Sequence, residues 1–124
     1  MKKNDISSRR DIELLVDDFY NQVRKDAILG PLFENVYKIN WNTHIPVMYD
    51  FWENVLFHTG NYAGNPMQVH LQLHLKHPLK SVDFSKWINL FIETVDLMYE
   101  GEQAEKLKQH AKSIALVMHL KLFQ

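Results

Sequence analysis

The 124-residue sequence contains no cysteine, which excludes disulfide bonds, thiolate metal sites, iron–sulfur clusters and a cysteine nucleophile together. It also lacks an excess of either charge. The net charge is −1 with the seven histidines neutral, which gives no indication of binding to nucleic acid or to an anionic membrane. No run approaches the roughly 18 apolar residues that a membrane-spanning helix needs. We therefore expect a cytoplasmic protein.

The composition indicates one folded domain that spans residues 1–124. Hydrophobic residues make up 46% of the chain and charged residues 23%, which is ordinary for a globular protein and unlike a disordered chain. A chain of this length can bury a substantial core but is too short for two domains. No internal repeat, low-complexity tract or linker interrupts it.

Apolar residues recur at the three- and four-residue spacing of helices along nearly the whole chain. The spacing predicts helices over 11–25, from Asn42 or Thr43 onward, between Pro66 and Pro78, over 83–99 and over 102–122. No strand pattern occurs, so the prediction is a single all-α domain.

A few residues predict where these helices start and stop. Ser8, followed by Asp11 three residues later, forms a capping signal for the first helix. Gly30-Pro31 is expected to break the chain after it. Pro46 is expected in the first turn of the second helix, where a missing N–H costs least.

Three histidines, His70, His74 and His77, fall within eight residues of the helix that precedes Pro78. His70 and His74 are four residues apart and share a helix face, so a divalent metal clip across them is geometrically possible. Such a site normally needs a third or fourth ligand, and this helix contains no Asp or Glu. The alternative is a set of half-exposed imidazoles on an ordinary amphipathic helix.

Polar atoms also border the apolar faces of other helices. His44 stands one turn before Met48 on the inward side of its helix, and the hydroxyl of Tyr20 borders the inward stripe of the first helix. Trp87 adds an indole N–H that needs a partner when buried. Apolar walls with a few convergent donors are typical of a cofactor site. An imidazole such as His70 on one side and donors on the other would suit haem.

Five short motifs follow one another from Phe19 to Phe91. They are Phe19-Tyr20, Leu29-Gly30-Pro31-Leu32-Phe33, Trp41-x-x-His44-x-Pro46 leading to Phe51-Trp52, Gly64-Asn65-Pro66-x-x-x-His70-x-x-Leu73-His74, and Asp83-Phe84-x-x-Trp87-x-x-Leu90-Phe91. In this order the chain resembles the truncated haemoglobins of the third group, the short bacterial globins. The paired glycines common in the first two groups are absent, which favours the third group.

The resemblance implies a fold and a set of roles. The fold is a two-over-two α-helical sandwich around a haem pocket. His70 corresponds to the proximal ligand of a pentacoordinate haem iron. The residues that correspond to the ligand-binding distal pocket are Tyr20, His44, Met48 and Trp87. Side chains expected to pack on the haem are Phe33, Phe51, Trp52, Leu73 and Phe91. His74 is placed to approach a haem propionate, although a solvated surface imidazole is an equal alternative for it.

The resemblance also implies the cofactor, haem b, and small ligands: oxygen, nitric oxide, carbon monoxide or peroxide. Donors from Tyr20 and Trp87 would slow ligand release, which suits redox chemistry or detoxification better than simple storage. Nitric oxide dioxygenase-like or peroxidase-like turnover, supported by an unidentified reductase, would be consistent with this. A monomer or weak dimer is expected. The alternative is a haem-free helical module that binds another ligand or a partner.

Overall fold

The computed structural model describes residues 3–60, 62 and 79–122, so the predicted helix between Pro66 and Pro78 lies outside the described residues. Every element within the described residues is helical, and the all-α prediction is confirmed. The elements are α1 (Arg9–Lys25), α2 (Leu29–Pro31), the π-helix η1 (Leu32–Val36), α3 (Trp41–Phe57), α5 (Ser81–Met98) and α6 (Glu102–Leu122). No helix in this part of the chain is long and apolar enough to cross a membrane.

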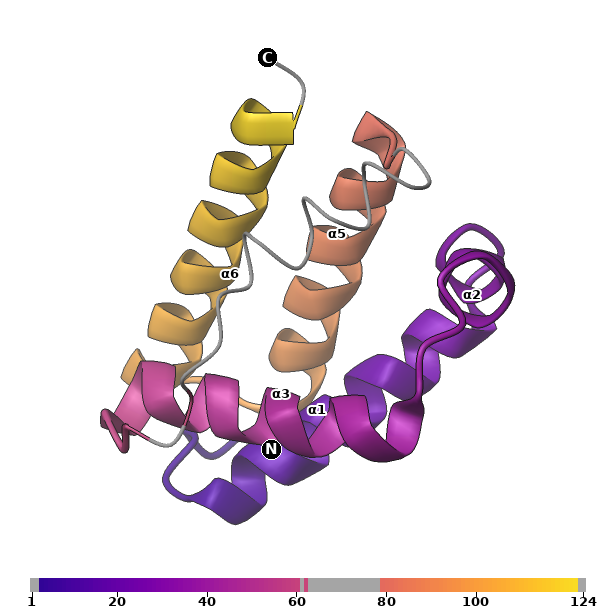
Figure 1. The fold of residues 1–124 in the computed structure, drawn as a ribbon. Helices are drawn as coiled ribbons and strands as arrows, with labels where there is room; N and C mark the ends of the chain where they lie inside the picture. The colour runs from indigo at the N-terminus through magenta and orange to yellow at the C-terminus, as the bar shows by residue number, and fades with distance from the viewer. Residues whose placement is uncertain (1–2, 61, 63–78, 123–124) are drawn as a thin grey trace.

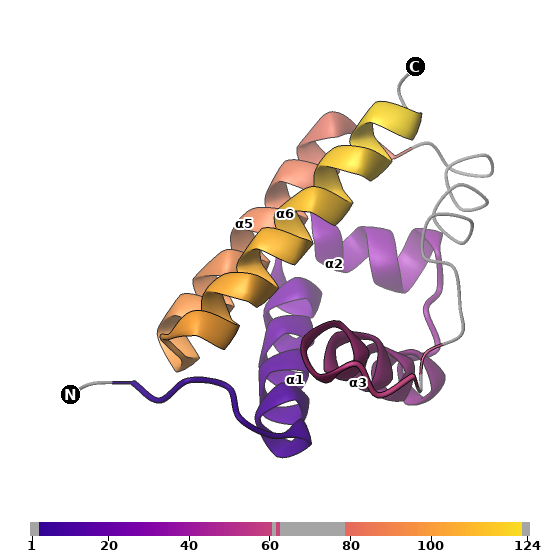
Figure 2. The ribbon, with the colours of Figure 1, turned by 90° about the vertical axis from the view of Figure 1, so that its left-hand side faces the viewer.

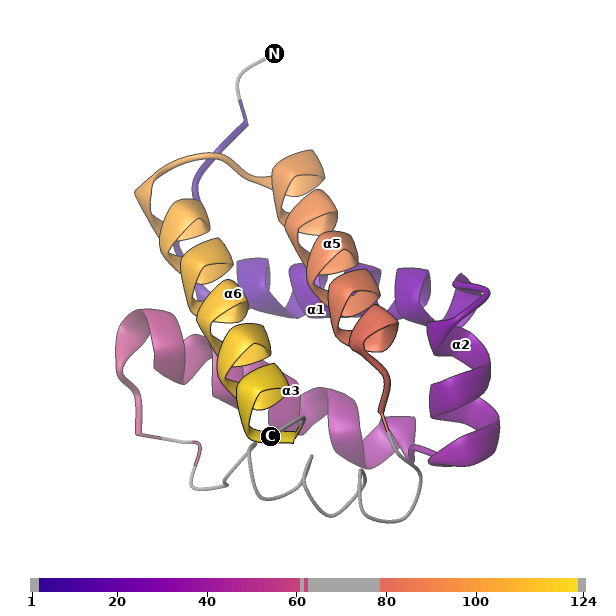
Figure 3. The same cartoon turned by 90° about the horizontal axis from the view of Figure 1, so that it is seen from above.

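The helices form two crossed layers. α5 and α6 lie side by side and pack on each other, and they cross over α1 and α3 (Figures 1 and 3). α1 contacts both α3 and α5, and α3 contacts α6, so each layer is joined to the other. This is the predicted two-over-two sandwich. α2 and η1 extend from the end of α1 toward the start of α3 (Figure 1).

The core lies where the two layers cross. The apolar residues that recur at helical spacing in α1 are all buried, as that spacing predicts: Ile12, Leu15, Val16, Phe19 and Val23. They meet buried side chains of the other long helices: Trp52, Leu56, Phe91, Val95, Ala104, Leu107 and Ala111. Thr94 is also buried, which the apolar pattern did not indicate. Its burial is tolerated because its hydroxyl donates to the carbonyl of Leu90 at 2.7 Å. Apolar periodicity therefore identified most of the core.

The N-terminal segment ties the start of α1 to the start of α6. Ser8 caps α1 as predicted, since its Oγ accepts from the N–H of Asp11 at 3.4 Å. Before Ser8, the segment passes the turn that joins α5 to α6 (Figure 2). There the carboxylate of Asp5 accepts from the N–H groups of Gln103 and Ala104, each at 2.9 Å. Gly101 has φ +141°, and a Cβ there would lie 2.5 Å from Cγ of Asp5. Only glycine fits this turn without strain.

The break after the first helix was predicted at the wrong place. Gly30-Pro31 does not interrupt the chain but lies inside α2, which runs directly into η1. A proline is tolerated there because the first-turn N–H groups have no intrahelical partner. Gly30 packs closely on α1, since an added Cβ would lie 2.6 Å from the carbonyl oxygen of Arg24. The chain turns instead at Asp26, which ends α1 in an extended conformation.

Pro46 also lies deeper in its helix than predicted. α3 begins at Trp41, so Pro46 is its sixth residue and leaves one carbonyl of the first turn without an intrahelical donor. The backbone of Asn40 accepts from Thr43 and His44, which closes the first turn despite the proline. The earlier start places Trp41 and His44 together in the first turn of α3.

Asp26 joins the end of α1 to α2 and α5. Its Oδ1 accepts from the N–H groups of Ile28 and Leu29, each at 2.9 Å, and its Oδ2 lies 3.3 Å from Nζ of Lys86. Burial raises the pKa of Asp26, but these backbone hydrogen bonds and Lys86 outweigh burial and lower the pKa below its ordinary value. The carboxylate therefore contributes stability in its charged form.

This contribution is fully present above the unfolded-state pKa of about 3.9 and is lost as the pH falls through the lower, folded-state value. We expect Asp26→Ala to lower the free energy of unfolding by about 1 kcal/mol at pH 6, as for the loss of a cap. The difference from wild type should shrink at pH 3. Urea unfolding at both pH values measures it, and an equal difference at the two would contradict the charged role.

Candidate functional site

A cavity of about 450 Å³ lies between the two layers, within the size range of small-molecule and cofactor sites. Helices α1, α3, α5 and α6 and the α2–η1 segment all contribute to its walls. Apolar and aromatic side chains predominate. The described residues that line it are Tyr20, Leu29, Leu32, Phe33, Tyr37, Ile39, Asn40, Thr43, His44, Val47, Met48, Phe51, Trp52, Tyr62, Leu79, Asp83, Phe84, Trp87, Ile114, Ala115 and Met118.

Tyr20 and His44 form the polar centre of one wall. The hydroxyl of Tyr20 lies 3.2 Å from Nε2 of His44, and the two rings meet edge to face with their centroids 5.3 Å apart. Tyr20 is 5% exposed, and burial raises its pKa above its ordinary value. The hydroxyl therefore stays protonated at neutral pH and can act as a hydrogen-bond donor.

The two elements that carry this pair position it for different reasons. Tyr20 is on the buried stripe of α1, so its ring is held against Phe19 at a centroid distance of 4.9 Å. His44 is half-buried in the first turn of α3, where the sequence did not determine its direction. In the structure it faces the cavity, because the hydroxyl of Tyr20 provides the partner that a partly buried imidazole needs.

Another wall is a stack of aromatic rings. Trp87 lines the cavity and stacks on Phe91 with an interplanar angle of 11°, and Trp52 stacks on the same Phe91 at 25°. Phe91 itself is fully buried and is not among the lining residues. It stacks against Trp52 and Trp87 and supports them, and its predicted contact with haem stays a prediction.

The remaining predicted residues divide into two sets. Phe33, Met48, Phe51, Trp52 and Trp87 line the cavity together with Tyr20 and His44. His70, Leu73 and His74 lie outside the described residues, as does the alternative metal clip across His70 and His74. Within the described ranges, no group of three or more His, Asp or Glu side chains could hold a metal ion.

Several lining residues were not predicted. Tyr37, just beyond η1, faces the cavity near Asp83, and desolvation together with the charge of Asp83 raises its pKa to about 12. No periodicity marks Tyr37, because it follows an irregular helix. Ile114, Ala115 and Met118 recur at helical spacing on the apolar face of α6, but that spacing does not distinguish a cavity wall from a filled core.

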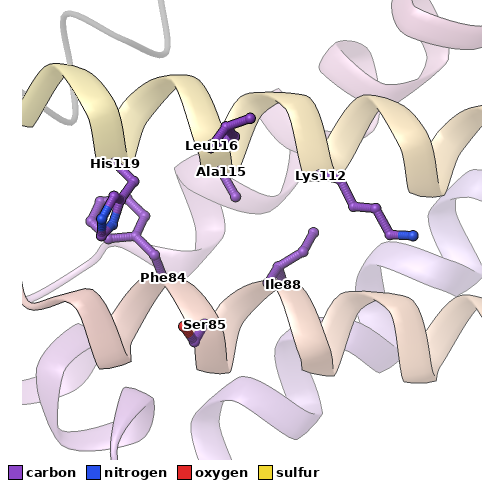
Figure 4. A pocket seen from close by; sticks show the side chains of 7 residues that line it. All are labelled: Phe84, Ser85, Ile88, Lys112, Ala115, Leu116 and His119. Carbon is purple, nitrogen blue, oxygen red and sulfur yellow. The ribbon is translucent and has the colours of Figure 1, made fainter.

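A smaller, open hollow of about 240 Å³ lies between α5 and α6. Figure 4 shows Phe84 reaching from α5 and His119 from α6 until their rings meet, with a centroid distance of 6.1 Å. Phe84 and Ala115 line both the hollow and the larger cavity. These two side chains therefore separate the two spaces.

The chain is similar to proteins of one kind. No family model matches it. It is 33% identical over 111 residues to the group 3 truncated haemoglobin ctb of Campylobacter jejuni, a match that covers 87% of this chain and 85% of that protein. The crystal structure of a group III truncated haemoglobin from Campylobacter jejuni superposes with a TM-score of 0.85 and 31% identity, over 97% of this chain and 94% of that chain.

Proposed function

The chain belongs to the group III truncated haemoglobin family, and from this premise we propose that it binds haem b in the cavity and takes a diatomic ligand, oxygen or nitric oxide, at the iron. The observation that carries the proposal is the contact between Tyr20 and His44. It places hydrogen-bonding groups of two helices, 3.2 Å apart, on the wall of an otherwise apolar and aromatic cavity.

The residues present fit a flat apolar cofactor. Trp52, Trp87 and Phe51 offer ring surfaces, and Met48 and Val47 add aliphatic contact. Burying a planar ring between such side chains is favourable without further polar partners. The polar residues Tyr37, Asn40 and Asp83 also line the cavity and would suit the polar groups of a cofactor that is otherwise apolar.

When bound, haem supplies an iron that coordinates the ligand. His70, which lies outside the described residues, is the proposed iron ligand by its place in the family motif. His74, also outside them, is the proposed propionate contact. Both roles come from the resemblance, and the side chains of Tyr20, His44 and Trp87 are proposed to face the diatomic ligand.

The pairing of Tyr20 with His44 constrains the proton positions. A hydroxyl has one hydrogen, so Tyr20 can donate to a ligand only if it does not donate to His44. His44 must then carry a proton on Nε2 and donate it to the oxygen of Tyr20. We expect this imidazole proton to orient the hydroxyl toward the ligand. Because the walls of the cavity are mostly apolar, each such hydrogen bond counts for more than it would in water.

Two further lining residues complete the proposed ligand site. Trp87 lines the cavity and is held by its stack on Phe91, so its indole N–H is the proposed second donor. Met48 lies one turn after His44 and keeps the wall beside Tyr20 apolar. Two donors would hold a ligand tightly and release it slowly, which is a poor property for a carrier.

We therefore propose a role in oxygen and nitric oxide redox chemistry or detoxification. Turnover of a nitric oxide dioxygenase or peroxidase type would need a reductase as electron donor, and carbon monoxide would bind as a competing ligand. The donors of Tyr20 and Trp87 would stabilise negative charge that develops on the ligand.

Haem titration of the purified protein tests the proposal. We expect a stoichiometric Soret band that shifts with carbon monoxide in the wild type. His70→Ala should lose or strongly alter this band, because the iron would lack its protein ligand. His58→Asn is the matched control, since His58 is an exposed histidine that does not line the cavity and asparagine tolerates its left-handed backbone. Absence of saturable haem binding by the wild type would favour the alternative hypothesis of a haem-free helical module.

A further inference from the structure

A carboxylate outside the cavity ties three elements together beside the Tyr20–His44 pair. Oε1 of Glu34, on η1, accepts from Nε1 of Trp41 at 3.0 Å and from Nε of Arg24 at 2.8 Å. The guanidinium of Arg24, on α1, also lies 5.2 Å from the centroid of the Trp41 ring. One oxygen therefore connects α1, η1 and the first residue of α3.

Trp41 borders both partners of the hydrogen bond in the cavity wall. Its ring centroid lies 5.4 Å from that of Tyr20 and 6.1 Å from that of His44. On a third side it stacks against Phe33, which lines the cavity, at 6.1 Å and 27°. A rotation of the Trp41 ring would therefore release contacts with the tyrosine and the imidazole together.

We propose that Glu34 is a positioning residue that acts through Trp41 to hold His44 against Tyr20. The Glu34 carboxylate accepts from the indole N–H of Trp41 and so limits rotation of the indole. The Trp41 ring in turn limits movement of the Tyr20 and His44 rings beside it, which maintains the Tyr20–His44 contact in the cavity wall. The effect on the imidazole stands by itself, whereas the consequence for ligand entry rests on the proposed haem function.

The structure separates this role from a general contribution to stability. The Glu34 and Arg24 side chains are 38% and 48% exposed, and an ion pair so exposed contributes little to the stability of a fold. Variants at Glu34 should therefore fold. These variants remove the acceptor of the Trp41 N–H. The change should therefore appear in the tautomer state of His44 and not in the midpoint of unfolding.

Nuclear magnetic resonance of the ¹⁵N-labelled full chain, as purified, tests the first part. In the wild type the bond to Tyr20 should favour one tautomer of His44, seen in the imidazole ¹⁵N shifts. Glu34→Ala should average the tautomers, and Trp41→Phe should do the same because it keeps a ring but removes the N–H. Glu34→Gln should largely preserve the wild-type signals, since its amide oxygen can still accept. Wild-type His44 signals in Glu34→Ala or Trp41→Phe would overturn the proposal.

Carbon monoxide rebinding after photolysis of the haem-loaded protein tests the second part. An open form would be one in which His44 has moved away from Tyr20. If it is populated to about 10% or less in the wild type, losing the Glu34–Trp41 hydrogen bond should speed association about fivefold or more in Glu34→Ala. Lys108→Gln is the matched control, because it breaks ion pairs with Asp96 on α5 and Glu105 on α6, and none of these three residues lines the cavity. Equal rates in Glu34→Ala and wild type would overturn a role in ligand entry. A wild type that binds no haem would overturn the proposed function while the His44 spectra still decide the positioning role.

Discussion

Tyr20→Phe should speed the release of oxygen from the haem-loaded protein about tenfold or more, if the lost hydrogen bond contributes about 1.5 kcal/mol. The change removes one oxygen atom and keeps the ring that packs against Phe19. It takes away the donor proposed to face the ligand and also the partner of Nε2 of His44. Stopped-flow measurement of the oxygen dissociation rate checks it.

The matched control is Tyr99→Phe. Tyr99 is also buried, and its hydroxyl donates to the carbonyl of Asp11 at 3.0 Å, away from the residues that line the cavity. Tyr99→Phe should lower the free energy of unfolding slightly and leave the oxygen dissociation rate unchanged. A Tyr20→Phe protein that releases oxygen at the wild-type rate would remove Tyr20 from the mechanism. The proposed ligand contact would then fall to Trp87 alone.

Phe91→Ala should lower the free energy of unfolding by about 3–5 kcal/mol, the usual cost of deleting a buried phenyl ring. Phe91 is fully buried and contacts three aromatic rings: Phe19 at 5.1 Å, Trp52 at 4.8 Å and Trp87 at 5.7 Å between centroids. Since small domains are stable by only about 5–15 kcal/mol, this single change would remove a large share of the stability. Urea unfolding measures it.

Phe91→Leu separates loss of volume from loss of aromatic stacking. Leucine retains part of the volume that alanine loses, so Phe91→Leu should cost less than Phe91→Ala. Both variants remove the ring that supports Trp52 and Trp87, so both should weaken haem binding even where the chain remains folded. A Phe91→Ala protein within about 1 kcal/mol of wild type would show that the cavity wall does not depend on this ring.

These two changes act on different properties of the molecule. Tyr20→Phe should alter ligand kinetics and lower the free energy of unfolding by only about 1 kcal/mol, because one hydrogen bond is lost but the packing remains. Phe91→Ala should alter unfolding first and ligand kinetics only through displaced tryptophans. Comparing the two variants separates the effect of a hydrogen-bond donor in the cavity wall from the effect of the packing that holds the wall in place.

The amino-acid sequence by itself determined the helices and most of the core. The inward stripe of α1 was predictable because each buried residue recurs one turn after another, and the bounds of α6 agree with the prediction. The capping role of Ser8 was equally local, since donor and acceptor lie three residues apart. The ordered motifs that contain Tyr20, His44 and Trp87 also sufficed to indicate the family.

Contacts between distant segments were decided only by the tertiary structure. The chain turns at Asp26 and not at Gly30 partly because Asp26 meets Lys86, sixty residues later in the chain. His44 faces the cavity because a hydroxyl from another helix lies within hydrogen-bonding distance. Helical periodicity tells which face of a helix is apolar, but it does not tell which neighbour will cover that face.

The same limit applies to Phe91 and Glu34. Phe91 has the spacing of a residue that faces inward, yet whether it lines the cavity or supports the wall depends on how Trp52 and Trp87 stack over it. From the sequence alone, Glu34 is indistinguishable from an ordinary surface charge. Only the packing of α1 and α3 places Arg24 and Trp41 within hydrogen-bonding distance of Oε1 of Glu34. Local patterns determine what each segment buries, whereas the direction and partner of each polar side chain follow from the packing of helices that are far apart in the chain.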